Sequence, residues 1–341
     1  MSFLGNLGEA YKEHHIINDF IFPGSSKASY SWDTFRPSEL ICIETGGPES
    51  LTIPCLFLRG MAPARMTQKT SPEDIVDQQG KPELESASTV LIYCHANSED
   101  LGSIYACAQW ICQMLGVHVL VPEYPGYGLC SGNPCESSVN KAVLAACHWV
   151  RDSMCWDPDH IVIYGRSIGT GPAINAAAKG LVGGVILVSP YTSIREIVQE
   201  HVGSVISWLT AGSSDWHNLA MMAEVQCPVL LIHGTTDEII PASHSKALHG
   251  ACSAPKRLIL LEKVGHQEME LLYALVQASP GMFPLYDRPL KVDLTPLSNK
   301  IVATKGDAKV PVFALEKTSE DLSWGDNAGE MTIDGRQVFV L

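Results

Sequence analysis

The sequence predicts an α/β protein with one mostly parallel β-sheet covered by helices on both faces, and three observations support this. From residue 89 onward, short apolar runs alternate with longer segments of helical spacing, the pattern of βαβ units with right-handed crossovers. The short runs are apolar throughout rather than alternating, as strands buried on both faces are. The chain has 341 residues, 46% of them hydrophobic, which is enough for one large domain with a sizeable core.

The expected elements follow in chain order. Residues 39–44 and 51–58 predict a β-hairpin around Gly46-Gly47-Pro48. The period of the hydrophobic residues and the positions of the turn residues then distinguish strands from helices. The predicted strands are 89–94, 117–121, 161–164, 185–188, 229–232 and 257–261, and the predicted helices are 101–115, 137–152, a helix from Gly171, and 242–248.

We expect three parts: an N-terminal arm (1–37), the α/β domain (38–280) and a C-terminal extension (281–341) with short β-like runs at 310–315 and 337–341. The arm carries an apolar patch between Ile16 and Phe22, and its packing on the domain is favoured over contact with a membrane. Polar residues 61–87 predict a mobile insertion at a loop tip. Residues 191–226 predict a small cap over the site, with an ordinary packed helix as the alternative.

Composition excludes several classes of function. A net charge of −14 argues against nucleic acid partners and against electrostatic docking on anionic lipid. The eleven cysteines show no C-x-x-C pair and no metal-ligand spacing with histidine, which indicates a reducing compartment and no metal site. The N-terminus shows no secretion signal. Residues 101–122 carry no formal charge but predict a helix followed by a strand. We therefore expect a cytoplasmic protein, with peripheral contact to the cytosolic face of membranes left open.

The motif around which the chemistry is organised is G-x-S-x-G at Gly165-Arg166-Ser167-Ile168-Gly169. It follows the apolar run 161–164 and precedes a segment of small helix-forming residues. This order of strand, sharp turn and helix is that of a nucleophile elbow, in which a strained serine is exposed at the top of a sheet. One alternative is a glycine-rich βα turn. A dinucleotide-binding loop is disfavoured, because Ser167 takes the place of its second glycine.

A serine nucleophile needs a base and a group that orients the base, and in this architecture the chain order is serine, acid, histidine. Strand 229–232 leads to Asp237 and Glu238. We select Asp237, which lies nearer the strand and has the shorter side chain, and keep Glu238 as the alternative. His266 follows strand 257–261 and is the only histidine after His249. The other histidines, including His95 and His233, are expected to have structural roles.

Two backbone amides should stabilise the developing oxyanion. Ile168 follows the nucleophile and supplies the first, and Asn97, in the loop after strand 89–94, is expected to supply the second. The neighbouring Glu99 and Asp100 are expected to cap the next helix. Loop 123–132 predicts a tight turn, either beside the pocket or as a structural corner. Arg166 is expected to form an ion pair rather than to contact substrate.

Several of these segments together resemble the α/β-hydrolase domain-containing protein 17 family of serine hydrolases, over about residues 20–275. The resemblance implies the α/β-hydrolase fold and a protein depalmitoylase, which cleaves thioesters at S-acylated cysteines of membrane-attached proteins. It implies a catalytic triad of Ser167, Asp237 and His266. Three features depart from the family. The first cysteine is Cys42, where the family has an acylated N-terminal cysteine cluster, and Ala96 follows His95 where the family has glycine. Residues 61–87 and the tail after Gly281 are additions to the family pattern. The matching segments are 93–102, 124–132, 164–172, 189–194, 233–241 and 265–266.

Three hypotheses remain open. The first is hydrolysis of acyl thioesters on proteins, with S-acylated proteins as partners and without a cofactor. The second is a general carboxylesterase or lipase, because acyl chemistry is common to both and selectivity lies in the pocket. The third is a non-enzymatic interaction protein on the same fold, which the ordered triad disfavours.

Overall fold

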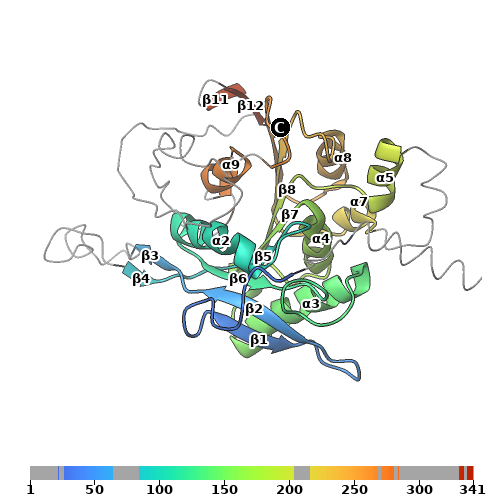
Figure 1. Cartoon of the computed structure of the whole chain (residues 1–341). Coiled ribbons are helices and arrows are strands. Elements are labelled where there is room, and N and C mark those ends of the chain that lie inside the picture. The colour runs from blue at the N-terminus through green and yellow to red at the C-terminus, as the bar shows by residue number, and fades with distance from the viewer. Residues whose placement is uncertain are drawn as a thin grey trace, which may run out of the picture.

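The structure is a computed structural model, and it describes residues 22, 27–63, 84–202, 216–267, 270–279, 283, 330–333 and 336–340. A single large sheet crosses the molecule, with helices on both of its faces (Figure 1). The predicted α/β-hydrolase fold, with a mostly parallel and doubly covered sheet, is confirmed.

The large sheet has ten strands in the order β1-β2-β6-β5-β7-β8-β9-β10-β12-β11. The six strands from β6 to β10 in this order are parallel, and the flanking strands β1, β2, β12 and β11 are antiparallel to their neighbours. Parallel strands carry their loops to one common edge, so β5, β7, β9 and β10 bring distant parts of the sequence together. The strands are β1 (Leu40–Glu44), β2 (Thr52–Leu58), β5 (Val90–Cys94), β6 (His118–Pro122), β7 (Ile161–Arg166), β8 (Gly184–Val188), β9 (Val229–Gly234), β10 (Lys256–Leu261), β11 (Glu330–Ile333) and β12 (Arg336–Val340).

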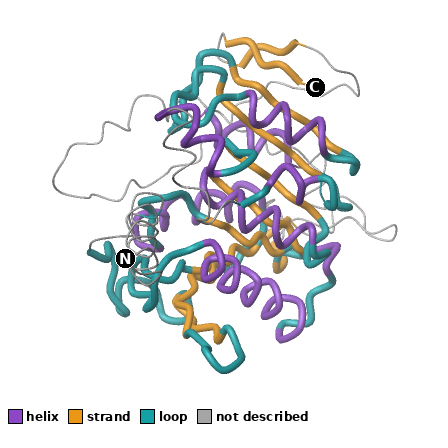
Figure 2. Tube along the Cα trace, turned by 90° about the vertical axis from the view of Figure 1, so that its right-hand side faces the viewer, coloured by secondary structure: helices purple, strands orange, loops and turns teal. Residues whose placement is uncertain are grey.

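Alternate residues of each central strand enter different hydrophobic clusters, one on each face of the sheet. In β5, Ile92 belongs to the cluster under α3, α4 and α8, and Leu91 to the cluster under α2 and α9. Because both faces are covered, these strands are apolar throughout. In Figure 2 helices lie along the strands of the sheet. The helices are α2 (Leu101–Leu115), α3 (Glu136–His148), α4 (Thr170–Ala178), α5 (Ile194–Val202), α7 (Asn218–Met222), α8 (Ser243–Ala251) and α9 (Glu270–Ala278).

The central elements lie where the sequence predicts them, and the differences are local. Helix α3 ends at His148 and continues as a π-helical turn (Trp149–Ser153), where we predicted one helix to residue 152. Within the predicted insertion 61–87, β3 (Met61–Pro63) pairs with β4 (Leu84–Ser86), and residues 64–83 lie outside the described residues. The predicted β-like run 337–341 corresponds to β12, whereas 310–315 lies outside the described part.

The described part of the N-terminal arm packs against the domain. Phe22 is buried, with its ring 5.7 Å from the Trp216 ring. The Ser29 backbone donates a 2.7 Å hydrogen bond to Asp100, and Tyr30 reaches Glu123. The rest of the apolar patch, residues 16–21, lies outside the described residues. No helix in the described ranges is both long enough and apolar enough to cross a membrane, and residues 101–122 form α2 and β6.

Candidate active site

The sharp turn between β7 and α4 carries Ser167 in a left-handed backbone conformation, with φ of 52°. Such a value is rare for a residue with a side chain, and it places the serine in a sharp turn at the end of the strand. Glycines on either side permit the turn. A Cβ on Gly165 would lie 2.6 Å from the Gly169 carbonyl oxygen, and a Cβ on Gly169 would collide with the Cys94 carbonyl at the end of β5. The spacing of G-x-S-x-G therefore follows from close backbone packing.

The loops after β9 and β10 bring Asp237 and His266 to Ser167. His266 Nε2 lies 3.1 Å from Ser167 Oγ, and His266 Nδ1 lies 2.7 Å from Asp237 Oδ2. An ionised carboxylate only accepts hydrogen bonds, so Nδ1 carries the proton and Nε2 can accept one from the serine hydroxyl. This tautomer is the one that general-base activation of a serine requires.

The Asp237 carboxylate is buried and held from several sides. Its Oδ1 accepts backbone hydrogen bonds of 2.9 and 2.8 Å from Ile239 and Ile240, and Oδ2 lies 3.3 Å from His233 Nε2. Burial alone would raise the pKa of Asp237, but the contacts with His233, His266 and the Ile240 amide lower it well below the ordinary value. The acid therefore stays ionised beside His266.

Glu238, the alternative acid, makes different contacts from Asp237. The Glu238 side chain is exposed, and its backbone carbonyl lies 3.2 Å from His201 Nε2 in α5. The structure thus brings Asp237 to the histidine, as the shorter distance from the strand end suggested. The contact between His233 and the acid was not predicted from the sequence. The i,i+4 spacing of His233 and Asp237 at the end of β9 is the signal that could have indicated it.

The turn formed by residues 96–99 faces the elbow and carries Asn97. The Glu99 amide donates to the Ala96 carbonyl at 3.3 Å, and the Ala96 amide donates to Glu99 Oε2 at 2.7 Å. Asn97 Oδ1 accepts a 2.6 Å hydrogen bond from Tyr127. Asn97 and Ile168 both line the pocket at Ser167, so the two expected oxyanion donors belong to one site.

Next to this turn, His95 and Glu123 form a buried pair of a histidine and a carboxylate. His95 Nε2 is 3.1 Å from Glu123 Oε1, and both side chains are fully buried. Glu123 Oε2 accepts hydrogen bonds from the Tyr30 hydroxyl and the Leu101 amide. Burial alone would lower the pKa of His95, but the contact with Glu123 raises it above the ordinary value.

Loop 123–132 forms a structural corner that supports the turn 96–99. Tyr124 donates to the His95 carbonyl at 2.9 Å, and its ring stacks on the His95 ring at 3.9 Å. Tyr127 holds Asn97, as described above. The corner therefore supports the site through its hydrogen bonds to His95 and Asn97, and none of residues 123–132 lines the pocket.

Ser167 opens into a cavity of about 630 Å³ whose walls differ in character. One wall is polar and contains Glu99, Arg166 and Gln267. The apolar side chains of the lining form what we call the apolar wall. It comprises Tyr191, three residues of α5 (Ile194, Ile197 and Val198), and Ile239 and Ile240 of the acid loop. Of the residues predicted to form a cap, 203–215 lie outside the described residues.

One predicted role in this region is wrong. Asp100 caps α2 through a reciprocal pair of hydrogen bonds with Ser103, as expected, but Glu99 does not cap the helix. Its carboxylate instead pairs with Arg166, Oε1 to Nη1 at 2.8 Å. The ion pair expected for Arg166 is therefore present, and its partner lies on the loop after β5. No group of His, Cys, Asp and Glu in the described ranges could hold a metal ion.

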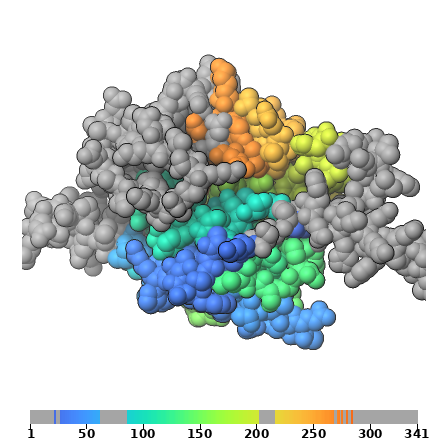
Figure 3. All heavy atoms as spheres, viewed as in Figure 1, coloured from blue at the N-terminus to red at the C-terminus, as the bar shows by residue number. Residues whose placement is uncertain are grey.

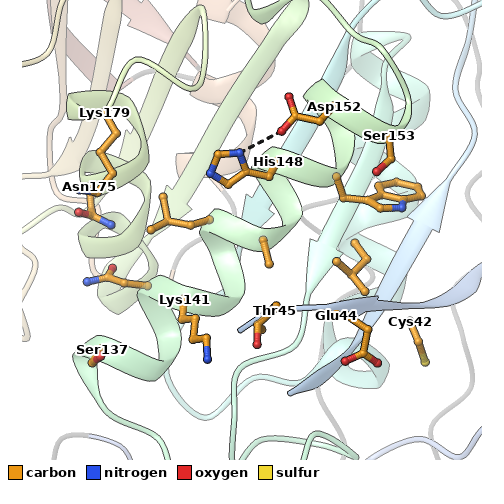
Figure 4. A pocket seen from close by; sticks show the side chains of 16 residues that line it. Cys42, Glu44, Thr45, Ser137, Lys141, His148, Asp152, Ser153, Asn175 and Lys179 are labelled. Carbon is orange, nitrogen blue, oxygen red and sulfur yellow. Dashed lines mark hydrogen bonds and ion pairs between the residues drawn. The ribbon is translucent and has the colours of Figure 1, made fainter. Parts of the chain in front are cut away.

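A larger hollow of about 910 Å³ lies elsewhere, between β1, α3 and the end of α4 (Figure 4). Its labelled side chains include His148, which contacts Asp152 across 3.2 Å. In the space-filling view the N-terminal hairpin region borders the segment that contains α3 (Figure 3). This hollow shares no lining residue with the cavity at Ser167.

Comparison with known proteins gives a consistent result. Residues 136–268 match the model of the prolyl oligopeptidase family. The chain is 28% identical to α/β hydrolase domain-containing protein 17B of Xenopus laevis, over 72% of this chain and 76% of that protein. It is 31% identical to protein 17C of the same species, over 53% of this chain and 57% of that protein. An esterase from Pyrococcus furiosus has a similar fold, with a TM-score of 0.52 and 13% identity, over 73% of this chain and 91% of that one.

Proposed function

Because this chain is related to the α/β hydrolase domain-containing proteins 17 and has the fold of serine hydrolases, we propose that it hydrolyses acyl thioesters on proteins. Palmitate attached to cysteine is the substrate group that we assign. The observation that carries the proposal is the chain of contacts from Ser167 through His266 to Asp237. Ser167 and His266 line a cavity that also contains the apolar wall.

In the first half of the reaction, Ser167 Oγ attacks the thioester carbonyl carbon while His266 Nε2 takes the hydroxyl proton. The amides of Ile168 and Asn97 stabilise the negative charge on the carbonyl oxygen. Asp237 stabilises the imidazolium through Nδ1. The C–S bond then breaks, His266 returns its proton to the departing cysteine sulfur, and the acyl group remains on Ser167.

The second half repeats these roles with water. His266 takes a proton from the water as its oxygen attacks the acyl carbon, and the same amides stabilise the second oxyanion. The bond to Ser167 breaks, and the serine oxygen recovers its proton from His266. The fatty acid leaves and the enzyme is regenerated. Asp237 remains ionised throughout, in keeping with its lowered pKa.

The apolar wall supports an acyl substrate. Ile194 is buried, and Ile239 is 52% exposed at the edge of the cavity, so apolar surface continues from the interior to the mouth. An alkyl chain that covers this surface is favoured by roughly 25 cal/mol for each Å² removed from water.

A general carboxylesterase or lipase would use the same chemistry, so the experiment compares substrates. We expect a palmitoyl-thioester peptide to be turned over with a higher kcat/KM than a short-chain p-nitrophenyl ester, and a chromogenic prolyl peptide to be a poor substrate. Ser167→Ala should remove the activity on all of them. A higher kcat/KM on the short ester or on the prolyl peptide would contradict the proposal.

The proposed setting is the cytoplasm, at the cytosolic face of membranes, where S-acylated proteins are attached. All eleven cysteines lie in the described part of the chain and none forms a disulfide, which supports a reducing compartment. Fractionation of cells that express the tagged chain tests this assignment. Recovery from the secretory lumen would contradict it.

A further inference from the structure

Arg166 joins three loops that come from three different strands. It belongs to the elbow after β7, directly before Ser167. Its Nη1 donates to Glu99 Oε1 on the loop after β5, at 2.8 Å. Its Nη2 reaches the backbone carbonyl of His266, on the loop after β10, at 3.5 Å.

Glu99 carries this connection into the turn that holds Asn97. Its second oxygen, Oε2, accepts the Ala96 amide at 2.7 Å, so the two carboxylate oxygens hold the start of the turn and the elbow at once. Ser98, inside the turn, has a φ of 63°, a conformation that is costly for a residue with a side chain. Such a turn persists only where surrounding contacts fix it, and the Glu99 carboxylate provides one of them.

We infer that Arg166 and Glu99 are positioning residues that fix the oxyanion turn and the His266 loop relative to Ser167. This inference rests on the proposed serine hydrolysis. The pair acts on the alignment of the reacting groups rather than on binding of the acyl chain.

Two features make alignment, rather than stability, the main role of the pair. Arg166 and Glu99 both line the cavity at Ser167, and their contacts join loops of the site rather than residues of the hydrophobic clusters. Catalysis depends steeply on geometry, because a displacement of about 1 Å costs on the order of a hundredfold in rate. Loss of one oxyanion donor costs about a hundredfold to a thousandfold.

The experiment measures steady-state hydrolysis of the palmitoyl-thioester peptide and the rate of labelling by a fluorophosphonate probe. We expect Arg166→Gln to lower kcat and the labelling rate together, by about tenfold to a hundredfold, with KM nearly unchanged. Glu99→Gln should have a similar effect. The double variant should lose no more than the larger single loss, because both residues serve one connection.

A second arginine provides a matched control. Arg151 pairs with Asp152 at 2.7 Å beside the hollow along α3, far from Ser167 in the fold. Arg151→Gln removes a more exposed ion pair, whose side chains are 32% and 54% exposed, and it should leave kcat, KM and the labelling rate unchanged. Arg166→Lys keeps the charge but has no planar fork to reach both Glu99 and the His266 carbonyl, so its rate should lie between those of the wild type and Arg166→Gln.

Three results would overturn the inference: an unchanged labelling rate in Arg166→Gln, a raised KM with unchanged kcat, or additive losses in the double variant. Circular dichroism and thermal unfolding of each variant give the folded fraction, and a rate loss equal to the loss of folded protein would also overturn it. Failure of the proposed function is distinct. If the protein were no serine hydrolase, the wild type itself would not be labelled at Ser167, and if only the thioester assignment were wrong, the wild type would be labelled but would prefer the short ester or the prolyl peptide.

Discussion

The hollow along α3 and the cavity at Ser167 differ in a way that their volumes do not reveal. The hollow along α3 is the larger, about 910 Å³ against about 630 Å³ at Ser167. It too contains a histidine beside an aspartate, since His148 lies 3.2 Å from Asp152 (Figure 4). However, His148 and Asp152 are about half exposed, at 50% and 54%, whereas His266 and Asp237 are 10% and 0% exposed.

The order of the contacts separates the two hollows further. At Ser167 the histidine stands between an acid and a serine, with one ring nitrogen for each. At the larger hollow both Asp152 and Arg151 contact the same ring nitrogen of His148, and in the described part of the chain no hydrogen bond joins His148 to Ser137 or Ser153. The comparison shows that alignment at the carboxyl edge of the sheet, rather than volume, indicates where chemistry takes place.

The largest expected difference between the two regions concerns the aspartates. Asp237→Asn should lower kcat by about ten-thousandfold, because asparagine presents the wrong partner to His266 Nδ1 and stabilises the wrong tautomer. Asp152→Asn should leave kcat unchanged. Steady-state hydrolysis of the thioester peptide by both variants checks this, and similar activities in the two would remove the distinction.

Buried and exposed carboxylates should also differ in stability. Glu123→Ala leaves His95 without its partner in a fully buried place, and we expect a loss of about 3–5 kcal/mol in the free energy of unfolding. Glu44→Ala, at the exposed edge of the larger hollow, should change it by less than about 0.5 kcal/mol. Urea unfolding curves measure both. A small loss for Glu123→Ala would mean that the pair does not hold the loop.

The apolar wall should affect selectivity. Ile197→Ala removes apolar surface from α5, so kcat/KM for a long acyl chain should fall by about tenfold relative to that for an acetyl ester. Leu144→Ala, on the wall of the larger hollow, is the matched change and should leave this ratio as it is. If Ile197→Ala and Leu144→Ala gave the same ratio of kcat/KM for the long acyl chain to kcat/KM for the acetyl ester, the acyl chain would not bind against Ile197.

The smallest effect concerns stability in acid. The folded pKa of Asp237 is lowered, so its ionised form contributes stability above the unfolded pKa of about 3.9, and this contribution is lost as the pH falls. The free energy of unfolding should therefore decrease more steeply below about pH 5 in the wild type than in Asp237→Asn. Asp152 also has a lowered pKa, caused by Arg151, but it is 54% exposed, so Asp152→Asn should alter the slope less. Equal slopes in the wild type and Asp237→Asn would contradict the assignment.

The sequence predicted the central fold because its signals are local. The apolar run of β7, the glycines at 165 and 169 and the small residues of α4 are adjacent in the chain, and they suffice to indicate the elbow. The chain order of serine, acid and histidine led to the three side chains that the structure brings together. Asp237 was preferred to Glu238 because it lies nearer the strand end and has the shorter side chain, and the structure adds the backbone amides of Ile239 and Ile240 as the reason for its position.

What the sequence did not predict depends on residues far apart in the chain. Glu99 lies next to a helix start, where a capping role is the local expectation, and its partner Arg166 is 67 positions away. The pairing of His95 with Glu123 likewise depends on the juxtaposition of β5 and β6. The antiparallel pairing of β12 with β10 joins the C-terminal residues to the sheet edge, and no local pattern specifies that partner.

The most direct test of the central claim is the site of covalent labelling by a fluorophosphonate probe. Mass spectrometry of the digested, labelled protein should find the adduct on Ser167, and labelling should disappear in Ser167→Ala and fall sharply in His266→Ala while both variants keep the wild-type circular dichroism spectrum. An adduct on another residue, or a folded wild-type protein that takes up no label, would contradict the account.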